Sequence, residues 1–203
     1  MKISIKQKVL LLKLLIHISA FLPLAYLYYQ ALNDQLGADP VQRVIHFTGI
    51  GAFNLLLLTL TVSPLAKYFK RGYLLQVRRL LGLYTFFYAL FHVLNFLAFD
   101  LQFAWGLFIG EVVKRPYISI GMVAFLLLSA LAITSLNSIK RKMGRSWQSL
   151  HNFSYLILTL IAVHFYWSVK SEILVPLFYG LLSFIILLFR YKKLQQLFMR
   201  LFS

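Results

Sequence analysis

Six long stretches of this chain contain no Asp, Glu, Lys or Arg, and they constrain its fold more than any other feature. The stretches cover residues 14–33, 44–66, 80–99, 116–139, 146–169 and 173–189. A helix that crosses a bilayer needs roughly 17–25 mostly apolar residues, and each stretch meets that length. None of them alternates apolar and polar residues as a barrel strand would, and only helices and closed barrels satisfy the backbone in lipid. We therefore expect an all-α membrane protein, a bundle of six transmembrane helices.

The expected spans form one domain that occupies the whole chain, residues 1–203. They are placed at about residues 10–32, 46–66, 80–100, 116–137, 149–169 and 173–190, from the length a bilayer requires. The first span follows Lys2, Lys6 and Lys8, as the apolar part of a signal peptide would. It is too long for that role and no small-residue cleavage site follows it, so we expect it to be retained as a helix.

Composition excludes several classes of protein. Apolar residues make up 61% of the chain and charged residues 13%, which is too much apolar surface for a soluble fold of this size to bury. The chain has no cysteine, which excludes disulfides, thiolate metal sites and iron–sulfur clusters. The net charge of +16 does not indicate nucleic acid here, because the charges lie in the gaps between the apolar stretches.

The basic residues predict how the spans are oriented. If the six spans alternate in direction, 17 of the 21 Lys and Arg residues fall on one side, and that side also holds both termini. The positive-inside rule places it in the cytoplasm. All five acidic residues fall on the opposite side: Asp34, Asp39, Asp100, Glu111 and Glu172.

Histidines are the ionisable residues inside the predicted spans, and such groups are costly in lipid and usually functional. His92 lies 13 residues beyond Arg79, and His164 lies 13 residues beyond His151. At about 1.5 Å per residue, His92 and His164 are both roughly 20 Å above the cytoplasmic boundary, on two parallel helices. Neutral imidazoles at one level on facing helices suit the two axial ligands of a haem.

Other polar residues leave alternatives open. His151 is either a ligand of a second haem near the cytoplasmic face or a helix-capping or quinone-binding residue. Arg78 stands where the partner ligand would be expected, and a protonated guanidinium has no lone pair to give a metal. It can instead hold a haem propionate, a flavin phosphate or a quinone carbonyl. His17 either faces this inner site or makes a polar contact between helices, and His46 is either interfacial or a contact to a quinone or propionate.

Five strings in the chain resemble the MsrQ family, formerly called YedZ, which belongs to the ferric-reductase-like transmembrane group. The strings are LGADPVQRVIHFTG (36–49), VRRLLGLYTFFYALFH (77–92), KRPYISIG (114–121), KRKMGRSWQSLHNFSYL (140–156) and HFYWSVK (164–170). The likeness extends from Lys6 to Lys193. It implies that His92, His151 and His164 are haem-ligand positions. Arg78 or Arg79 stands where related oxidases have a fourth histidine, so the resemblance leaves one or two haems open.

The resemblance also implies a function. Such a protein is the cytochrome b subunit that carries electrons across the bacterial inner membrane, and it is described as binding haem b and FMN. The electrons come from the quinone pool or from a cytosolic flavin reductase. They go to MsrP, a periplasmic molybdoenzyme that reduces methionine sulfoxide in oxidised proteins, so the catalytic site lies on the partner. The rival interpretations of the sequence are a membrane transporter and a structural membrane anchor without a redox role.

Overall fold

The computed structural model describes residues 4–169, 171–191 and 195, and every regular element within them is helical. Lys2, Lys170, Lys192, Lys193 and Arg200, which contribute to the predicted charge distribution, lie outside the described residues. The elements are α1 (Ile5–Leu32), α2 (Pro40–Tyr68), the 3₁₀ helix η1 (Gly72–Val77), α3 (Arg78–Asn95), the π-helical turn η2 (Phe96–Asp100), α4 (Trp105–Lys114), α5 (Pro116–Ile133), α6 (Asn137–Met143), α7 (Arg145–His151), α8 (Ser154–Ser168) and α9 (Leu174–Leu188).

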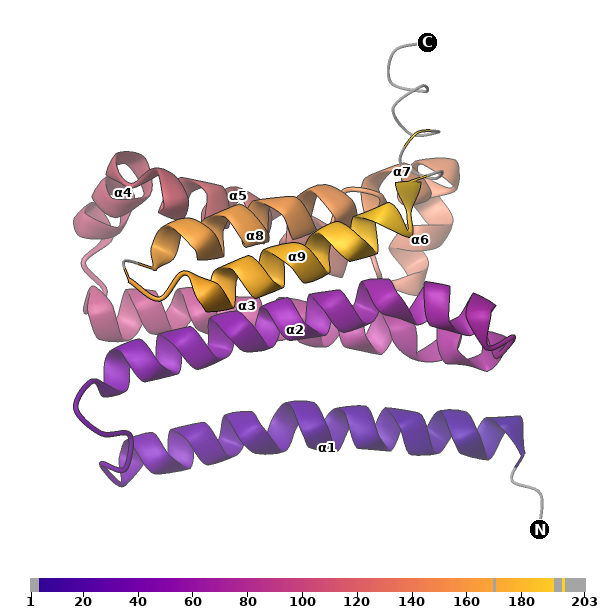
Figure 1. Cartoon of the computed structure of the whole chain (residues 1–203), viewed down its shortest axis with the longest axis horizontal. Coiled ribbons are helices and arrows are strands. Elements are labelled where there is room, and N and C mark those ends of the chain that lie inside the picture. Colours follow the sequence, from indigo (N-terminus) through magenta and orange to yellow (C-terminus); the bar gives the residue numbers. More distant parts are fainter. Residues whose placement is uncertain (1–3, 170, 192–194, 196–203) are drawn as a thin grey trace.

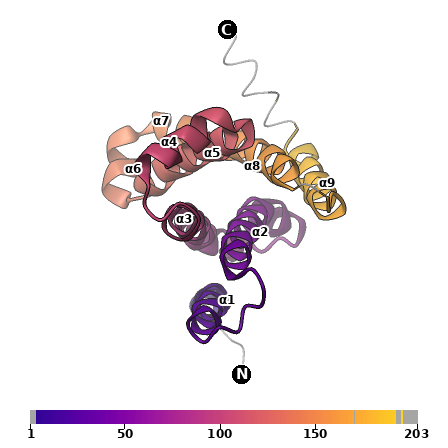
Figure 2. The same ribbon diagram turned by 90° about the vertical axis from the view of Figure 1, so that its left-hand side faces the viewer.

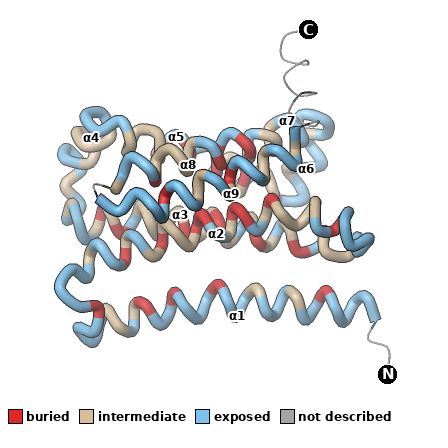
Figure 3. The backbone as a smooth tube through the Cα atoms, in the orientation of Figure 1, coloured by how far each residue is buried: buried red, intermediate tan, exposed pale blue. Residues whose placement is uncertain are grey.

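The long helices run side by side in three layers. Helix α1 lies alone on one side, α2 and α3 form the middle layer, and α5, α8 and α9 form an arc over them (Figures 1 and 2). The most extensive contacts between helices are those of α2 with α3 and of α5 with α8. Buried side chains gather where the middle layer meets the arc (Figure 3). The two pairs α2–α3 and α5–α8 therefore face each other across the core.

The two ends of the bundle differ in charge. One end holds the start of α1, the end of α2, η1, α6, α7 and the end of α9 (Figure 1). We call it the basic end, since Lys67, Arg78, Lys140 and Arg145 lie there. The other end holds the α1–α2 connection, η2, α4 and the α8–α9 connection, where all five acidic residues lie. Helix α1 therefore begins, and helix α9 ends, at the basic end.

Apolar side chains cover the outside of the bundle, as expected of a protein in lipid. Leu10 is 68% exposed, Leu126 61% and Phe184 58%. Within the described residues, four helical segments are long and apolar enough to cross a membrane: Ile5–Leu32, Pro40–Tyr68, Gly72–Asp100 and Pro116–Ile133. The chain is a multi-pass membrane protein. Helices α8 and α9 are 15 residues each, about 22 Å long at 1.5 Å per residue, so helix length alone supports four spans.

The structure differs from the expected spans in three places. Helix α1 begins at Ile5, because Ser4 and Gln7 form a capping box that starts the helix before Lys6. The expected span 149–169 is divided at Asn152, where α7 ends and α8 follows at Ser154. The connection before α5 contains the ten-residue helix α4. A search for uncharged stretches misses α4, because Glu111 interrupts its sequence.

Three prolines lie within or at the start of a long helix. Pro23 is inside α1 and Pro64 is inside α2, while Pro116 starts α5. A proline within a helix leaves the carbonyl four residues earlier without its N–H donor. A side chain from a neighbouring helix can then use that carbonyl, and this occurs at Leu60, as described below.

Candidate electron-transfer site

His92 of α3 and His164 of α8 meet between the middle layer and the arc. Their ring centroids are 6.2 Å apart and the ring planes are inclined at 83°. Each histidine belongs to one of the two closely packed helix pairs, so each ring is supported by the partner helix of its own pair. The structure thus brings together the two imidazoles that the sequence places at one depth.

Backbone carbonyls fix the tautomer of both rings. The Nδ1 atom of His92 lies 2.9 Å from the carbonyl oxygen of Ile45 on α2, and that of His164 lies 2.7 Å from the carbonyl oxygen of Tyr117 on α5. A carbonyl oxygen can only accept, so each Nδ1 must carry the proton and donate it. The lone pair of each ring is then on Nε2, the atom available to a metal.

A glycine lies beside each ring, one helical turn after the carbonyl. A Cβ atom added to Gly49 would lie 3.0 Å from Nδ1 of His92, and one added to Gly121 would lie 2.7 Å from Nδ1 of His164. In both pairs 43 residues separate the glycine from the histidine, and 47 separate the carbonyl residue from it. The same carbonyl–glycine arrangement therefore seats both imidazoles.

The residues present fit a haem better than a bare metal ion. Within the described ranges no group of three or more His, Asp or Glu side chains comes together, so the pair offers two protein ligands. A porphyrin supplies four further nitrogens, which completes six coordination positions. His92 and His164 would hold the iron through their Nε2 atoms, since metal–nitrogen bonds to imidazole are about 2 Å long and the two ring centroids are 6.2 Å apart.

His151 is not part of this pair. It ends α7 at the basic end, stacks on Trp147 at 3.9 Å, and its Nε2 lies 3.2 Å from the hydroxyl of Thr134. The charge of Arg78 acts on His151 electrostatically. Arg79 instead donates from Nη1 to Oδ1 of Asn137 at 3.0 Å.

His17 joins α1 to α3 through Tyr84. Its Nδ1 lies 2.7 Å from the Tyr84 hydroxyl, and both residues border a cavity of about 300 Å³ together with Phe21, Leu80, Leu83 and Phe87. The polar contact between helices expected for His17 is therefore present. Sequence reasoning did not single out Tyr84.

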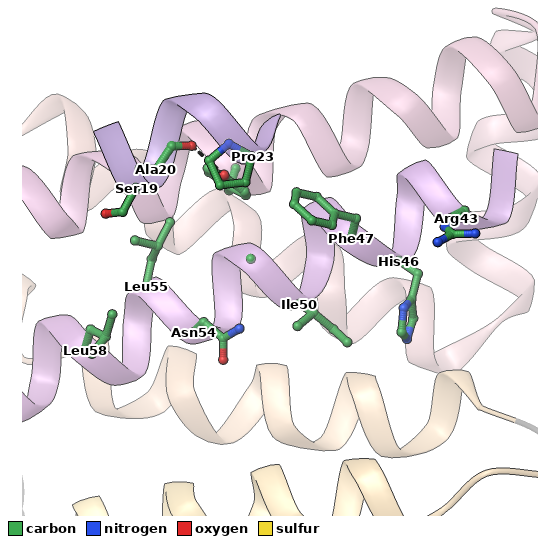
Figure 4. A pocket seen from close by; sticks show the side chains of 12 residues that line it. Ser19, Ala20, Pro23, Arg43, His46, Phe47, Ile50, Asn54, Leu55 and Leu58 are labelled. Atoms are coloured by element: carbon green, nitrogen blue, oxygen red, sulfur yellow. Dashed lines mark hydrogen bonds between the residues drawn. The ribbon is translucent and has the colours of Figure 1, made fainter. Parts of the chain in front are cut away.

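His46 lies at one end of a larger groove between α1 and α2, of about 480 Å³. His46, Ile50 and Asn54 are spaced four residues apart on α2 and point to the same side, while Ser19 and Pro23 come from α1 (Figure 4). The ring of His46 lies 6.1 Å from that of Phe165, the neighbour of His164. His46 also follows Ile45, whose carbonyl holds His92. The groove thus ends beside the histidine pair.

Sequence reasoning missed the partners that hold the two rings. Ile45 and Tyr117 act through backbone atoms, which no residue-type search detects. The repeated spacing of 43 residues from Gly49 to His92 and from Gly121 to His164 was the one signal that could have found the arrangement.

Comparison with known proteins shows the family of the chain. The family model described as "Ferric reductase like transmembrane component" matches residues 48–162, a range that includes His92 and His151. Three similar curated proteins share the printed name "Protein-methionine-sulfoxide reductase heme-binding subunit MsrQ". The protein of Pectobacterium carotovorum is 44% identical over 94% of this chain and 96% of its own length. The protein of Cronobacter sakazakii is 43% identical over 97% and 98%, and that of Klebsiella pneumoniae 43% over 97% and 97%. Identity at this level over nearly the full length of both chains, in a membrane protein whose fold juxtaposes the two histidines, places this chain in the MsrQ family.

Proposed function

We propose that this chain is a transmembrane cytochrome b subunit that passes electrons to a methionine sulfoxide reductase. The observation that carries the proposal is the facing pair His92 and His164, with both Nε2 lone pairs left available by carbonyl contacts on Nδ1. A haem bound by two imidazoles accepts and donates single electrons and has no open position for oxygen. The protein contributes ligand orientation through Ile45 and Tyr117, and an apolar surrounding that excludes water.

Family membership supports the proposed direction of electron flow. The proposed acceptor is MsrP, the periplasmic molybdoenzyme, and the proposed donors are the quinone pool or a cytosolic flavin reductase. In this proposal the whole chain, 1–203, is one six-span domain in the bacterial inner membrane, with the basic end in the cytoplasm. The test is a reduced-minus-oxidised spectrum of the detergent-purified protein, followed by reduction of MsrP by the reduced protein. A protein without reducible b-type haem would be a transporter or an anchor.

The proposed cofactor residues fall into two groups. His92 and His164 are the ligands of one haem b, and His151, Arg78 and Arg79 belong to the basic end, where a second haem or FMN would bind. A second haem needs another ligand opposite His151, and Arg78 cannot supply one. We therefore expect one haem per polypeptide, and His151→Ala should leave the haem content unchanged. A fall from two haems to one in that variant would assign a second haem to His151.

Quinol is proposed to deliver its electrons from the groove between α1 and α2. The groove is lined by apolar side chains, its polar groups include His46 and Asn54, and it ends beside the residues that hold His92. His17 and Tyr84 border the alternative entry, the cavity between α1 and α3. In both cases the imidazole would contact the quinol headgroup and accept a proton from one of its hydroxyls.

His46→Ala is expected to slow haem reduction by a short-chain quinol about tenfold or more, because general acid–base groups typically contribute 10²–10⁴-fold. The measurement is the rate of haem reduction in stopped flow, with the amplitude reached with dithionite as the check on haem content. His17→Ala is the matched control and should reduce at the wild-type rate. If His17→Ala slows haem reduction and His46→Ala does not, the quinol binds in the cavity beside His17 and Tyr84 instead.

A further inference from the structure

Two arginines from distant parts of the sequence converge on one turn of α2 at the basic end. Arg78, which starts α3, donates from Nη1 to the hydroxyl of Ser63 at 3.2 Å. Arg190, just beyond α9, donates from Nη2 to the carbonyl oxygen of Leu60 at 3.3 Å. Leu60 and Ser63 are three residues apart and lie on the same part of α2. The two guanidinium charges act on each other electrostatically, and the phenol of Tyr155 acts on Arg78.

Local structure holds Arg190 in this position. Pro64 has no N–H, so the Leu60 carbonyl lacks its usual helical donor, and Arg190 supplies one. The Nε atom of Arg190 is buried and has no hydrogen-bond partner among the described residues. Buried polar atoms are nearly always paired, and a charged donor without a partner is especially costly. Arg190 Nε therefore requires an acceptor from outside the described residues.

This chain has no acidic side chain that could supply the acceptor. All five Asp and Glu residues of the sequence lie at the opposite end of the bundle: Asp34, Asp39, Asp100, Glu111 and Glu172. The salt bridge found within the described residues also lies there, between Arg115 and Glu111 at 2.6 Å. The Arg78–Arg190 pair is thus a partly buried double positive charge that has no counter-charge among the described residues. A proposed haem at His92 is 14 residues along α3, roughly 20 Å away, too far to place a propionate here.

We propose that Arg78 and Arg190 form a binding site for a phosphate group. A phosphate offers several strong acceptor oxygens and at least one negative charge, which match two guanidinium groups. The position at the end of the bundle admits two sources of that chemistry, the headgroup of an anionic phospholipid and a free phosphomonoester such as FMN. The site does not depend on the haem and adds Arg190, a residue of no assigned role, to Arg78.

The test measures phosphate binding in Arg78→Gln, Arg190→Gln and Arg190→Lys. Nanodiscs of phosphatidylcholine with and without phosphatidylglycerol probe the lipid, with retained lipid read by native mass spectrometry. FMN added to delipidated protein, followed by quenching of its fluorescence, probes the free phosphomonoester. Each Gln variant should bind the preferred probe roughly tenfold more weakly, since charge-assisted hydrogen bonds are lost. Arg190→Lys should fall in between, because it keeps the charge and loses the planar fork.

Arg145→Gln is the matched control, as it removes the same charge from an exposed position at the same end of the bundle and should change binding less than about twofold. The dithionite-reduced haem spectrum shows that each variant is folded. Retention of phosphatidylglycerol identifies the lipid source, and FMN quenching identifies the phosphomonoester. The proposal is overturned if Arg78→Gln and Arg190→Gln bind both probes as tightly as Arg145→Gln does. It is also overturned if both probes bind more tightly to His92→Ala, measured without haem, than to the wild type, since a haem propionate would then have occupied the site.

Discussion

Replacing His92 or His164 by alanine is expected to abolish the b-type haem spectrum of the purified protein, and electron delivery with it. Each substitution removes one of two protein ligands, and no other histidine has its ring near the pair in the described structure except the exposed His46. Removing a residue that only orients a metal ligand costs 10–100-fold in metal affinity, so loss of the ligand itself should cost more than about 100-fold. The measurement is haem per polypeptide, together with the reduced-minus-oxidised spectrum.

His151→Ala provides the matched control, because it removes the same side chain from α7, where Nε2 already contacts Thr134. That variant should keep the full spectrum. Free imidazole should restore part of the spectrum to a His164→Gly variant, since the ligand can then enter the space left by the side chain. A complete reduced spectrum in both His92→Ala and His164→Ala would reject the assignment, and the chain would then have no identified redox centre.

The shared depth of His92 and His164 in the membrane could be predicted from the sequence, because the rise per residue of a helix is constant. Arg79 and His151 mark the same boundary on two helices, and 13 residues bring each helix to His92 and His164. The rise per residue does not show which faces α3 and α8 turn toward each other. Whether the rings meet depends on how α2, α3, α5 and α8 pack, and that packing involves contacts between residues far apart in the sequence.

The relation between His151 and His164 shows where periodicity fails. An uninterrupted α-helix turns by about 220° over 13 residues, so the two side chains would not share a face. The structure instead ends α7 at His151 and starts α8 at Ser154. No proline or glycine marks this break, and the contacts of Trp147 and His151 with Thr134 stabilise it. Tertiary contacts therefore decide it, rather than local sequence.

The arginines of the basic end were only partly predictable. Charge counting assigns Arg78 and Arg190 to the same side of the membrane, and the missing lone pair of Arg78 separates it from a metal ligand. Their convergence on Leu60 and Ser63 depends on a carbonyl that Pro64 leaves free. The sequence shows that Pro64 lies within an apolar stretch, but it does not reveal which side chain pairs with that carbonyl.

Gly121→Ala is expected to weaken haem binding by about 10–100-fold, the range found when the orienting partner of a metal ligand is lost. The added methyl carbon would lie 2.7 Å from Nδ1 of His164 and 2.8 Å from its Cε1, which is too close for the ring to stay in place. A displaced ring loses its 2.7 Å hydrogen bond to the Tyr117 carbonyl and with it the fixed position of Nε2. Haem titration of the apoprotein measures the affinity, and electron paramagnetic resonance of the oxidised protein reports the changed orientation of the ligand planes.

Two further glycines make this prediction a graded series. Gly49→Ala places its methyl carbon 3.0 Å from the ring of His92, a milder contact, whereas nothing lies within 4 Å of the position in Gly180→Ala. Haem affinity should therefore fall most for Gly121→Ala, less for Gly49→Ala, and not at all for Gly180→Ala. The last variant should also be slightly more stable, because alanine favours a helix by up to about 1 kcal/mol over glycine. Equal haem affinity in all three variants would show that the carbonyl–glycine seats do not position the ligands, and that the two rings find the iron without them.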